Sequence, residues 1–349
     1  MKNINILLVF VLSLFTFCSC ENIIDYNIGE TEDILVVNSL INSKKLNHVV
    51  YLSLSNNKKL KGLEGENAKV ELRQNNNVVA TCKLEENLAT SSKYSFEYQF
   101  KENEKYEIVV NCDNFHASSK LEVLPAPILV KVDTFYREAA SGGYYDYRSL
   151  VGCKVDIKDR ENEDNYYRLS AEMEVTVMPE DKSAILEVNT YPVSLYNESD
   201  LIMREETDDQ EGDIFEMGTF SNSINIFTDN LFKNKQTTLD LDLDRSVFET
   251  NGSKVLSKGD GNGAGEGEDD GRRYIEVKLK FYYSNITKEE YKYRKIASIL
   301  SSGNMQGLFT ESYIFPNNIE GGIGFIGIST PSVYELEVYK GIVYYGYYN

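Results

Sequence analysis

Residues 274–281 read YIEVKLKF, an alternation of apolar and polar side chains that decides the fold. Successive side chains of a β-strand point to opposite faces, so this order places the apolar members on a core and the polar members in water. The same period of two recurs in the segments 69–73, 95–100, 153–158, 171–177, 238–244 and 333–339. Repeated strands without helical patterns between them predict an all-β protein with antiparallel sheets.

One segment departs from the strand pattern. Thr287 and Glu290 have the spacing of a capping box, in which a hydroxyl and a carboxylate satisfy free N–H groups at the start of a helix. Apolar residues follow at helical spacing, and Gly303 suits the position after a helix C-terminus. We therefore expect one short helix at about 288–302.

The segment LPAPIL at 124–129 marks a predicted domain boundary, because its two prolines stiffen an extended connector. Before it, residues 34–124 are expected to form an immunoglobulin-like β-sandwich. After it, residues 128–349 are expected to form a larger antiparallel β domain that contains the short helix. Two acidic segments, 204–213 and 258–271, are interpreted as loop insertions in this larger domain.

The N-terminus has the order of a secretory signal. Lys2 precedes an apolar run, and the small residue Ser19 stands directly before Cys20. This order resembles a bacterial lipobox, in which the cysteine is joined to diacylglycerol and the preceding residues are removed. We therefore predict a signal peptide at residues 1–19, and lipidation of Cys20 that anchors the protein to a membrane. An ordinary signal peptide with incidental cysteines is the alternative.

Residues 20–33 form an acidic tether that contains no basic residue. A solvated spacer is the plain interpretation. In Bacteroidetes, however, acidic residues after the lipidated cysteine resemble the signal that moves lipoproteins to the outer face of the cell. We favour this second interpretation, so the expected location is the cell outer membrane, with the lipid-anchored protein facing outward.

The formal net charge of the chain is −19. Such a charge excludes a general nucleic-acid binder, because contacts to phosphates require Lys and Arg. It also argues against electrostatic attachment to anionic lipids. The membrane contact is therefore expected to come from the lipid anchor alone.

No motif in the sequence predicts catalysis, a cofactor or a metal site. The two histidines, His48 and His116, do not lie in an HExxH motif, and no GxSxG elbow is present. The segment 258–271 lacks the bidentate Glu that an EF-hand needs, because Gly271 stands in its place. We therefore expect a protein that is not an enzyme and holds no cofactor.

Three cysteines follow the anchor, at positions 82, 112 and 153. Cys82 and Cys112 lie in the same expected domain, so a disulfide between them is one possibility. Three buried free thiols are the favoured alternative, because the chain lacks a dense cysteine framework.

The stretch GGIGF at 321–325 has glycines at close intervals. Glycines in a strand indicate a bulge, a bend or close approach of another backbone. A phosphate-binding loop would need a GK[ST] ending or a following helix, and neither is present. We therefore favour a structural role over contact with a ligand.

Eight segments occur in an order that resembles the DUF4249 family of Bacteroidetes outer-membrane lipoproteins. They are ILVVNSLI (34–41), YLSLS (51–55), NAKVEL (67–72), KYEIVV (105–110), VDIKDRENEDNYYRL (155–169), FTDNLF (227–232), EEYKYRKIASIL (289–300) and NIEGGIGFIG (318–327). The chain departs from the family by its long acidic insertions and by IGIS, where members often have an aromatic residue. Members commonly occur beside TonB-dependent outer-membrane receptors, so the resemblance implies an accessory subunit at the cell surface. It supplies no catalytic residue.

The leading hypothesis is therefore a non-enzymatic surface lipoprotein that is accessory to a TonB-dependent nutrient transporter, through ligand capture or as a subunit. An adhesin or structural surface protein that binds another macromolecule is the alternative, and an enzyme such as a hydrolase comes third. We expect the larger domain to contact the partner, because binding residues favour loops on a rigid scaffold. Four aromatic residues are candidate contacts: Tyr282, Tyr283, Tyr313 and Phe315. Tyrosines that only cover sheet faces are the alternative.

Overall fold

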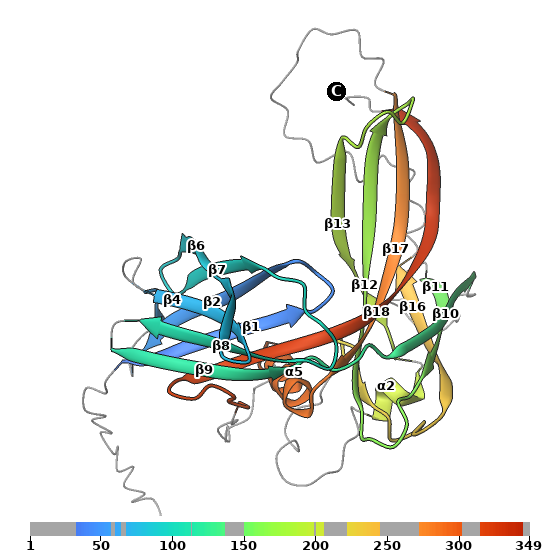
Figure 1. Ribbon diagram of the computed structural model, residues 1–349. Coiled ribbons are helices and arrows are strands. Elements are labelled where there is room, and N and C mark those ends of the chain that lie inside the picture. The colour runs from blue at the N-terminus through green and yellow to red at the C-terminus, as the bar shows by residue number, and fades with distance from the viewer. Residues whose placement is uncertain are drawn as a thin grey trace, which may run out of the picture.

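The computed structural model describes residues 33–56, 60–63, 68–112, 114–136, 150–198, 200–205, 222–244, 272–301 and 315–344. Within these ranges the chain is mostly β, with three sheets and two helices (Figure 1). The predictions of a β protein and of a helix near 288–302 are confirmed, whereas the immunoglobulin-like arrangement stays a prediction. No helix in the described ranges combines the length and the apolarity needed to cross a bilayer.

Nine strands form the N-terminal part. They are β1 (Ile34–Asn42), β2 (Asn47–Ser55), β3 (Leu60–Lys61), β4 (Ala68–Gln74), β5 (Asn77–Thr81), β6 (Lys83–Asn87), β7 (Ser92–Glu97), β8 (Lys105–Cys112) and β9 (Phe115–Glu122). A four-stranded sheet has the order β5-β4-β8-β9, and the remaining strands belong to a larger sheet. Apolar residues of both sheets, such as Leu52 and Tyr94 from one and Val70 and Ile108 from the other, share one buried cluster.

The second part contains the remaining elements. They are β10 (Ile128–Tyr136), β11 (Leu150–Lys158), β12 (Tyr166–Pro179), β13 (Glu187–Val193), β14 (Leu195–Tyr196), α2 (Leu201–Glu205), β15 (Ile226–Thr228), β16 (Gln236–Asp244), β17 (Arg272–Ile286), α5 (Lys288–Ser301) and β18 (Ile323–Tyr344). The sheet β10-β11-β16-β14 packs on β12 and β17, and residues such as Val155, Leu241, Val175 and Leu279 join one core.

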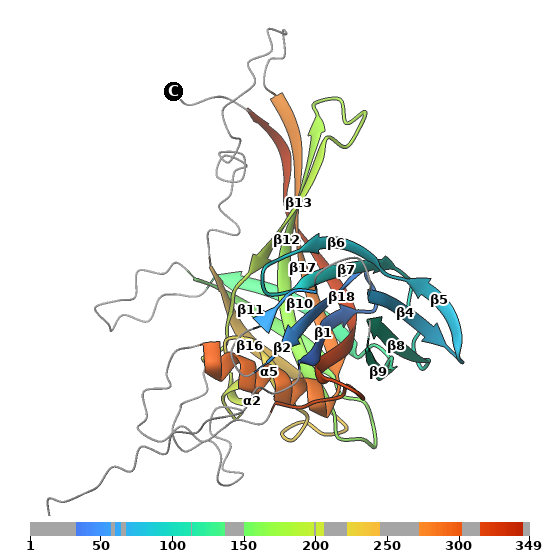
Figure 2. The ribbon, with the colours of Figure 1, turned by 90° about the vertical axis from the view of Figure 1, so that its left-hand side faces the viewer.

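The long strand β18 connects the two parts. Residues 323–329 pair with β1 in parallel, and residues 330–344 pair with β17 in antiparallel orientation. A ten-stranded sheet therefore runs through the molecule in the order β13-β12-β17-β18-β1-β2-β7-β6, with β15 on β12 and β3 on β2 (Figures 1 and 2).

The core of the N-terminal part also includes Ile319, Ile326 and Ile328, which lie in the predicted second domain. A division at 124–129 into 34–124 and 128–349 stays a prediction. In the structure the two parts have separate buried clusters but a common sheet.

The glycines of 321–325 allow β18 to connect the two parts. Gly321 has φ of 78° and Gly324 has φ of 125°, values that side chains rarely permit. A Cβ atom on Gly321 would lie 2.2 Å from the carbonyl oxygen of His116, and one on Gly324 would lie 2.1 Å from that of Val37. Of the structural roles predicted for these glycines, close approach of another backbone is the one that the structure shows.

The three described cysteines are buried thiols that form no disulfide, so the favoured alternative is confirmed and Cys82 is not joined to Cys112. Burial raises the pKa of Cys82 and of Cys153 to about 12. These thiols are core residues without thiolate character at neutral pH.

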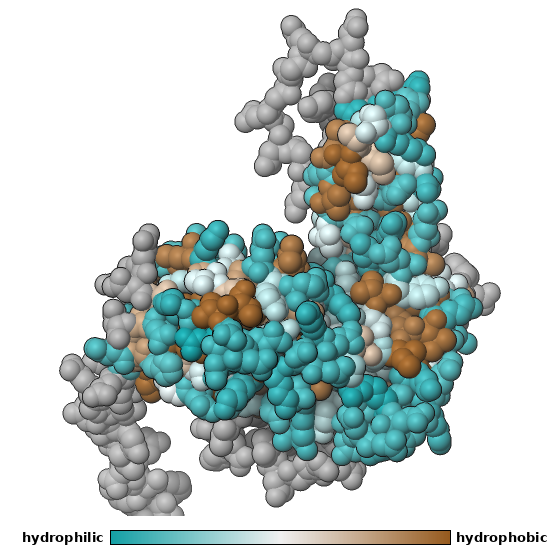
Figure 3. Space-filling model, in the orientation of Figure 1, coloured by the Kyte–Doolittle hydropathy of each residue, from teal (hydrophilic) through white to brown (hydrophobic). Residues whose placement is uncertain are grey.

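We name the strands β13, β12, β17 and the C-terminal part of β18 the blade, because they stand upright from the rest of the molecule (Figure 1). Its surface shows apolar areas (Figure 3). Near the turn between β12 and β13, Ile185 is 66% exposed, Leu186 is 54% exposed and Val188 is 49% exposed. Grouped apolar side chains of this kind are typical of a contact surface.

Candidate functional site

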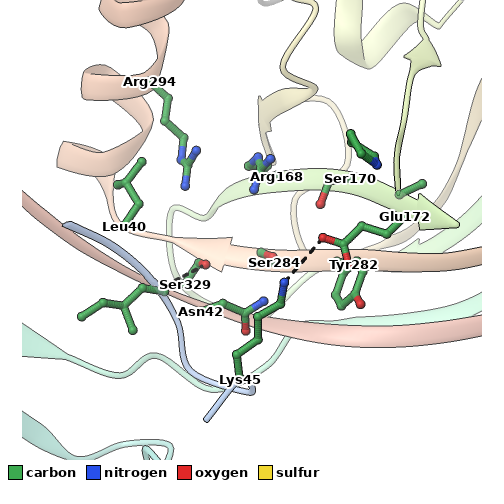
Figure 4. A pocket seen from close by; sticks show the side chains of 13 residues that line it. Leu40, Asn42, Lys45, Arg168, Ser170, Glu172, Tyr282, Ser284, Arg294 and Ser329 are labelled. Carbon is green, nitrogen blue, oxygen red and sulfur yellow. Dashed lines mark hydrogen bonds and ion pairs between the residues drawn. The ribbon is translucent and has the colours of Figure 1, made fainter. Parts of the chain in front are cut away.

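A pocket of about 230 Å³ lies at the corner between the N-terminal part and the blade (Figure 4). Its wall is made by the end of β1, by β12 and β17 of the blade, and by α5. Lys45, Pro192 of β13 and Ser329 of β18 complete the lining. The pocket therefore depends on segments that are far apart in the sequence.

The floor of the pocket is the polar face of β12 and β17. Arg168 lies opposite Ser284, and Ser170 lies opposite Tyr282 in the antiparallel register. Their neighbours Leu169 and Tyr283 point to the other face and are buried in the core. The alternation alone places the polar face in water, but here α5 and β1 cover it in part.

Helix α5 supplies Arg294. Its first turn is capped by Thr287, whose Oγ1 accepts a hydrogen bond from the backbone N–H of Glu290 at 3.1 Å. The Glu290 carboxylate bonds to Arg294, with 2.7 Å between Oε1 and Nη2. Tyr291 packs on Tyr166 of β12 with ring centroids 5.3 Å apart, which holds the helix over the sheet. The Arg294 side chain consequently reaches toward Arg168 (Figure 4).

The pocket gathers cations in a strongly acidic chain. Lys45 pairs with Glu172 at 3.5 Å, and Arg294 pairs with Glu290. The side chain of Arg168 makes no hydrogen bond or ion pair with any described residue, and its Nε is buried without a partner. The second carboxylate oxygen of Glu290 is likewise buried without a partner in the described ranges. One guanidinium charge therefore remains uncompensated by direct contact.

Burial and the neighbouring Arg294 guanidinium lower the pKa of Arg168 to about 10. The side chain thus stays protonated at neutral pH. Burial and the nearby Glu172 carboxylate raise the pKa of Tyr282, so its phenol stays neutral. At physiological pH the pocket offers a cation beside neutral hydroxyl groups.

The guanidinium and hydroxyl groups of the pocket are suited to binding a ligand. A guanidinium presents a planar fork of donors that matches carboxylate and phosphate groups. The hydroxyls of Ser170, Ser284 and Tyr282 can both donate and accept hydrogen bonds. In the described part of the chain, no group of His, Cys, Asp and Glu side chains is arranged to hold a metal ion.

The candidate contacts predicted from the sequence are not brought together here. Tyr282 lines the pocket. Tyr283 is fully buried and its ring lies 4.8 Å from that of Tyr167, so its side chain offers no surface to a partner. Phe315 is 39% exposed and packs beside Tyr293 of α5. Tyr313 lies outside the described residues.

Other sequence predictions also fall outside the described residues. They concern Cys20, the signal peptide 1–19, almost all of the tether 20–33, Gly303, residues 206–213 of the first acidic segment and the whole of 258–271.

The sequence analysis missed Arg168 and Arg294. Both lie in segments that carry the family resemblance, 155–169 and 289–300. In an alternating strand, however, an arginine on the polar face has the pattern of a solvent-facing residue. Only the pairing of β12 with β17 and the position of α5 show that the two arginines line the same pocket.

Comparisons with known proteins give a family and no activity. No curated protein matches the chain. One solved structure, titled "Biofilm associated protein - BSP domain", aligns with 7% identity and a TM-score of 0.15, over 87% of this chain and 59% of that protein. The chain thus spans less than two thirds of that protein, and a likeness this low carries no argument. The family described as "Domain of unknown function (DUF4249)" matches residues 21–335, so the chain belongs to the DUF4249 family.

Proposed function

We propose that this chain is a non-enzymatic outer-membrane lipoprotein that faces outward and is accessory to a TonB-dependent nutrient transporter. The observation that carries the proposal is the order at the N-terminus. Ser19 and Cys20 end an apolar run, and an acidic tether without basic residues leads to the first strand at Ile34. The resemblance to lipoproteins that occur beside TonB-dependent receptors supplies the expected partner.

In this proposal the two parts have different roles. Residues 34–124 are an immunoglobulin-like spacer next to the tether, with one core between two sheets. The blade serves partner contact, and the pocket, where the end of β1 and Lys45 meet the blade and α5, serves ligand contact. The apolar group at Ile185, Leu186 and Val188 is a candidate surface for the receptor.

The pocket supports binding over catalysis. Glu172, the carboxylate that lines it, is paired with Lys45, and Glu290 beside it is paired with Arg294. General acid–base catalysis needs a side chain within hydrogen-bond reach of the reacting group, and both of these carboxylates already contact a cation. An adhesin that uses the exposed group on the blade to bind another macromolecule is the second candidate.

Replacement of Cys20 tests the anchor. Cys20→Ala should release or misprocess the protein, because the lipid can no longer be attached. Cys18→Ala is the matched control, since this cysteine follows the bulky Phe17 and should not be lipidated. A mature Cys20→Ala protein of unchanged size in the outer membrane would contradict the lipoprotein proposal.

Surface proteolysis tests the orientation. In intact cells, protease should cut within the acidic segments 204–213 or 258–271, because an outward-facing protein exposes them. Protection of both segments in whole cells, followed by cleavage after lysis, would place the protein in the periplasm.

A further inference from the structure

We infer that the pocket binds a small hydroxylated carboxylate, such as an acidic monosaccharide, and that Arg168 is the residue that binds its carboxylate. The biological role of this binding rests on the proposed ligand capture. The binding itself is a property of the folded chain and can be measured without an anchor or a transporter.

Arg168 has no acceptor for its guanidinium among the described residues. Its Nε is buried without a hydrogen-bond partner, although the side chain lines the pocket. Donors that are withdrawn from water without a partner carry a free-energy cost. Of the nearby carboxylates, Glu172 pairs with Lys45, and Glu290 pairs with Arg294 through Oε1; neither forms an ion pair with Arg168. An anion that enters the pocket would supply the missing acceptor.

The charges of the pocket favour a single negative charge on the ligand. Three cations, Lys45, Arg168 and Arg294, and one carboxylate, Glu172, line it, and Glu290 pairs with Arg294 from outside the lining. A single negative charge balances the remaining guanidinium. A dianion such as phosphate would face repulsion from Glu172 and Glu290 without a further cation to offset it. A monoanionic carboxylate is therefore favoured.

The rest of the lining offers hydrogen-bonding groups. Ser170, Ser284, Tyr282 and Asn42 surround the approach to Arg168 with groups that can each donate and accept hydrogen bonds (Figure 4). Such groups match ligand hydroxyls better than an apolar body. The volume of about 230 Å³ lies below the range of roughly 300–1,000 Å³ that is typical for drug-sized ligands, so the occupant is about one sugar ring in size.

Titration calorimetry on the full-length protein in detergent tests the inference. The probes are glucuronate, galacturonate and N-acetylneuraminate, with glucose, galactose and inorganic phosphate as comparisons. At least one acid should bind at least about tenfold more tightly than its neutral counterpart and than phosphate, because only the carboxylate gains the charge-assisted hydrogen bonds.

Substitution of Arg168 then tests whether this residue binds the carboxylate of the ligand. Arg168→Gln should weaken binding of that acid at least about tenfold, because it keeps an amide but removes the charge. Lys278→Gln is the matched control, since it removes a cation from β17 outside the pocket and should leave binding unchanged. Thermal unfolding of both variants shows whether each is folded.

A second pair of variants covers the case in which Arg168→Gln does not fold. Lys45 is 55% exposed at the pocket, and Lys45→Gln should weaken binding about two- to fivefold by leaving Glu172 unpaired. Its neighbour Lys44 pairs with Glu102 at 2.6 Å and does not line the pocket, so Lys44→Gln should have no effect.

The inference is wrong if no acid binds more tightly than its neutral counterpart, or if phosphate binds best. It is also wrong if folded Arg168→Gln binds as well as wild type, which is the result expected when Arg168 only balances the charge of Glu290. These results do not depend on the fate of Cys20 variants, so failure of the pocket and failure of the anchor are distinguishable.

Discussion

Replacement of Gly324 by alanine should destabilise the protein strongly. This residue lies where β18 enters beside β1, paired with Val37. Its φ of 125° belongs to a region that is essentially restricted to glycine. A Cβ atom would lie 2.1 Å from the Val37 carbonyl oxygen and 3.0 Å from Oδ1 of Asn38. That oxygen accepts a hydrogen bond from the backbone N–H of Phe325 at 3.1 Å, so the new methyl group would disturb this bond as well.

The expected loss follows from three contributions. A side chain in this backbone region costs about 1–3 kcal/mol. Displacement of the Val37 carbonyl weakens one backbone hydrogen bond, and movement of Asn38 weakens another, each worth about 0.5–1.5 kcal/mol. The free energy of unfolding should therefore fall by roughly 2–6 kcal/mol, which is large for a single methyl group.

Chemical denaturation of Gly324→Ala and wild type measures this difference. Gly341→Ala is the control on the same strand, because its φ is not positive and its new Cβ would meet the side chain of Tyr339, with 2.7 Å to the hydroxyl oxygen. The movable ring can yield, so we expect a change of no more than about 1 kcal/mol. If Gly324→Ala is as stable as Gly341→Ala, the close approach of β18 to β1 is refuted.

Three further predictions concern buried groups. Burial lowers the pKa of His48 below its ordinary 6.5, so the unfolded chain binds more protons between the lowered pKa and 6.5. The free energy of unfolding should therefore fall as pH drops below 6.5, and denaturation of His48→Gln should lack this dependence. Thiol reagents near pH 8 should label Cys82 and Cys153 only after unfolding, because burial raises the pKa of each to about 12; fast labelling of the native protein would contradict their burial. Thr287→Ala should cost about 1 kcal/mol of stability by removing the helix cap, whereas Thr287→Ser should retain it in the same denaturation assay.

Local sequence patterns predict the elements of this fold. In YIEVKLKF the apolar members Ile275, Val277, Leu279 and Phe281 are all buried in one core, as the alternation requires. The helix near 288–302 follows from its capping threonine, and the Thr287 hydroxyl does bond the Glu290 N–H. Such features depend on residues that are close in sequence, so periodicity and caps are sufficient to find them.

The connection between the parts could not be predicted in this way. The pairing of β18 with β1 joins residues such as Ile323 and Val36, and no local pattern encodes a parallel partner at that separation. The pocket could not be predicted for the same reason. Arg168 has the period of a solvent-facing residue, and only the fold brings α5 and β1 over it. The pairing of β18 with β1 and the lining of the pocket therefore depend on contacts between residues that are distant in sequence, which local patterns do not predict.

We propose that this protein works beside a transporter at the cell surface. Affinity purification of the native protein from detergent-solubilised outer membrane, with mass spectrometry of what co-purifies, tests it most directly. We predict recovery of a TonB-dependent receptor with wild type and its loss with Cys20→Ala. Recovery of another surface macromolecule without any receptor would contradict the claim and favour the adhesin.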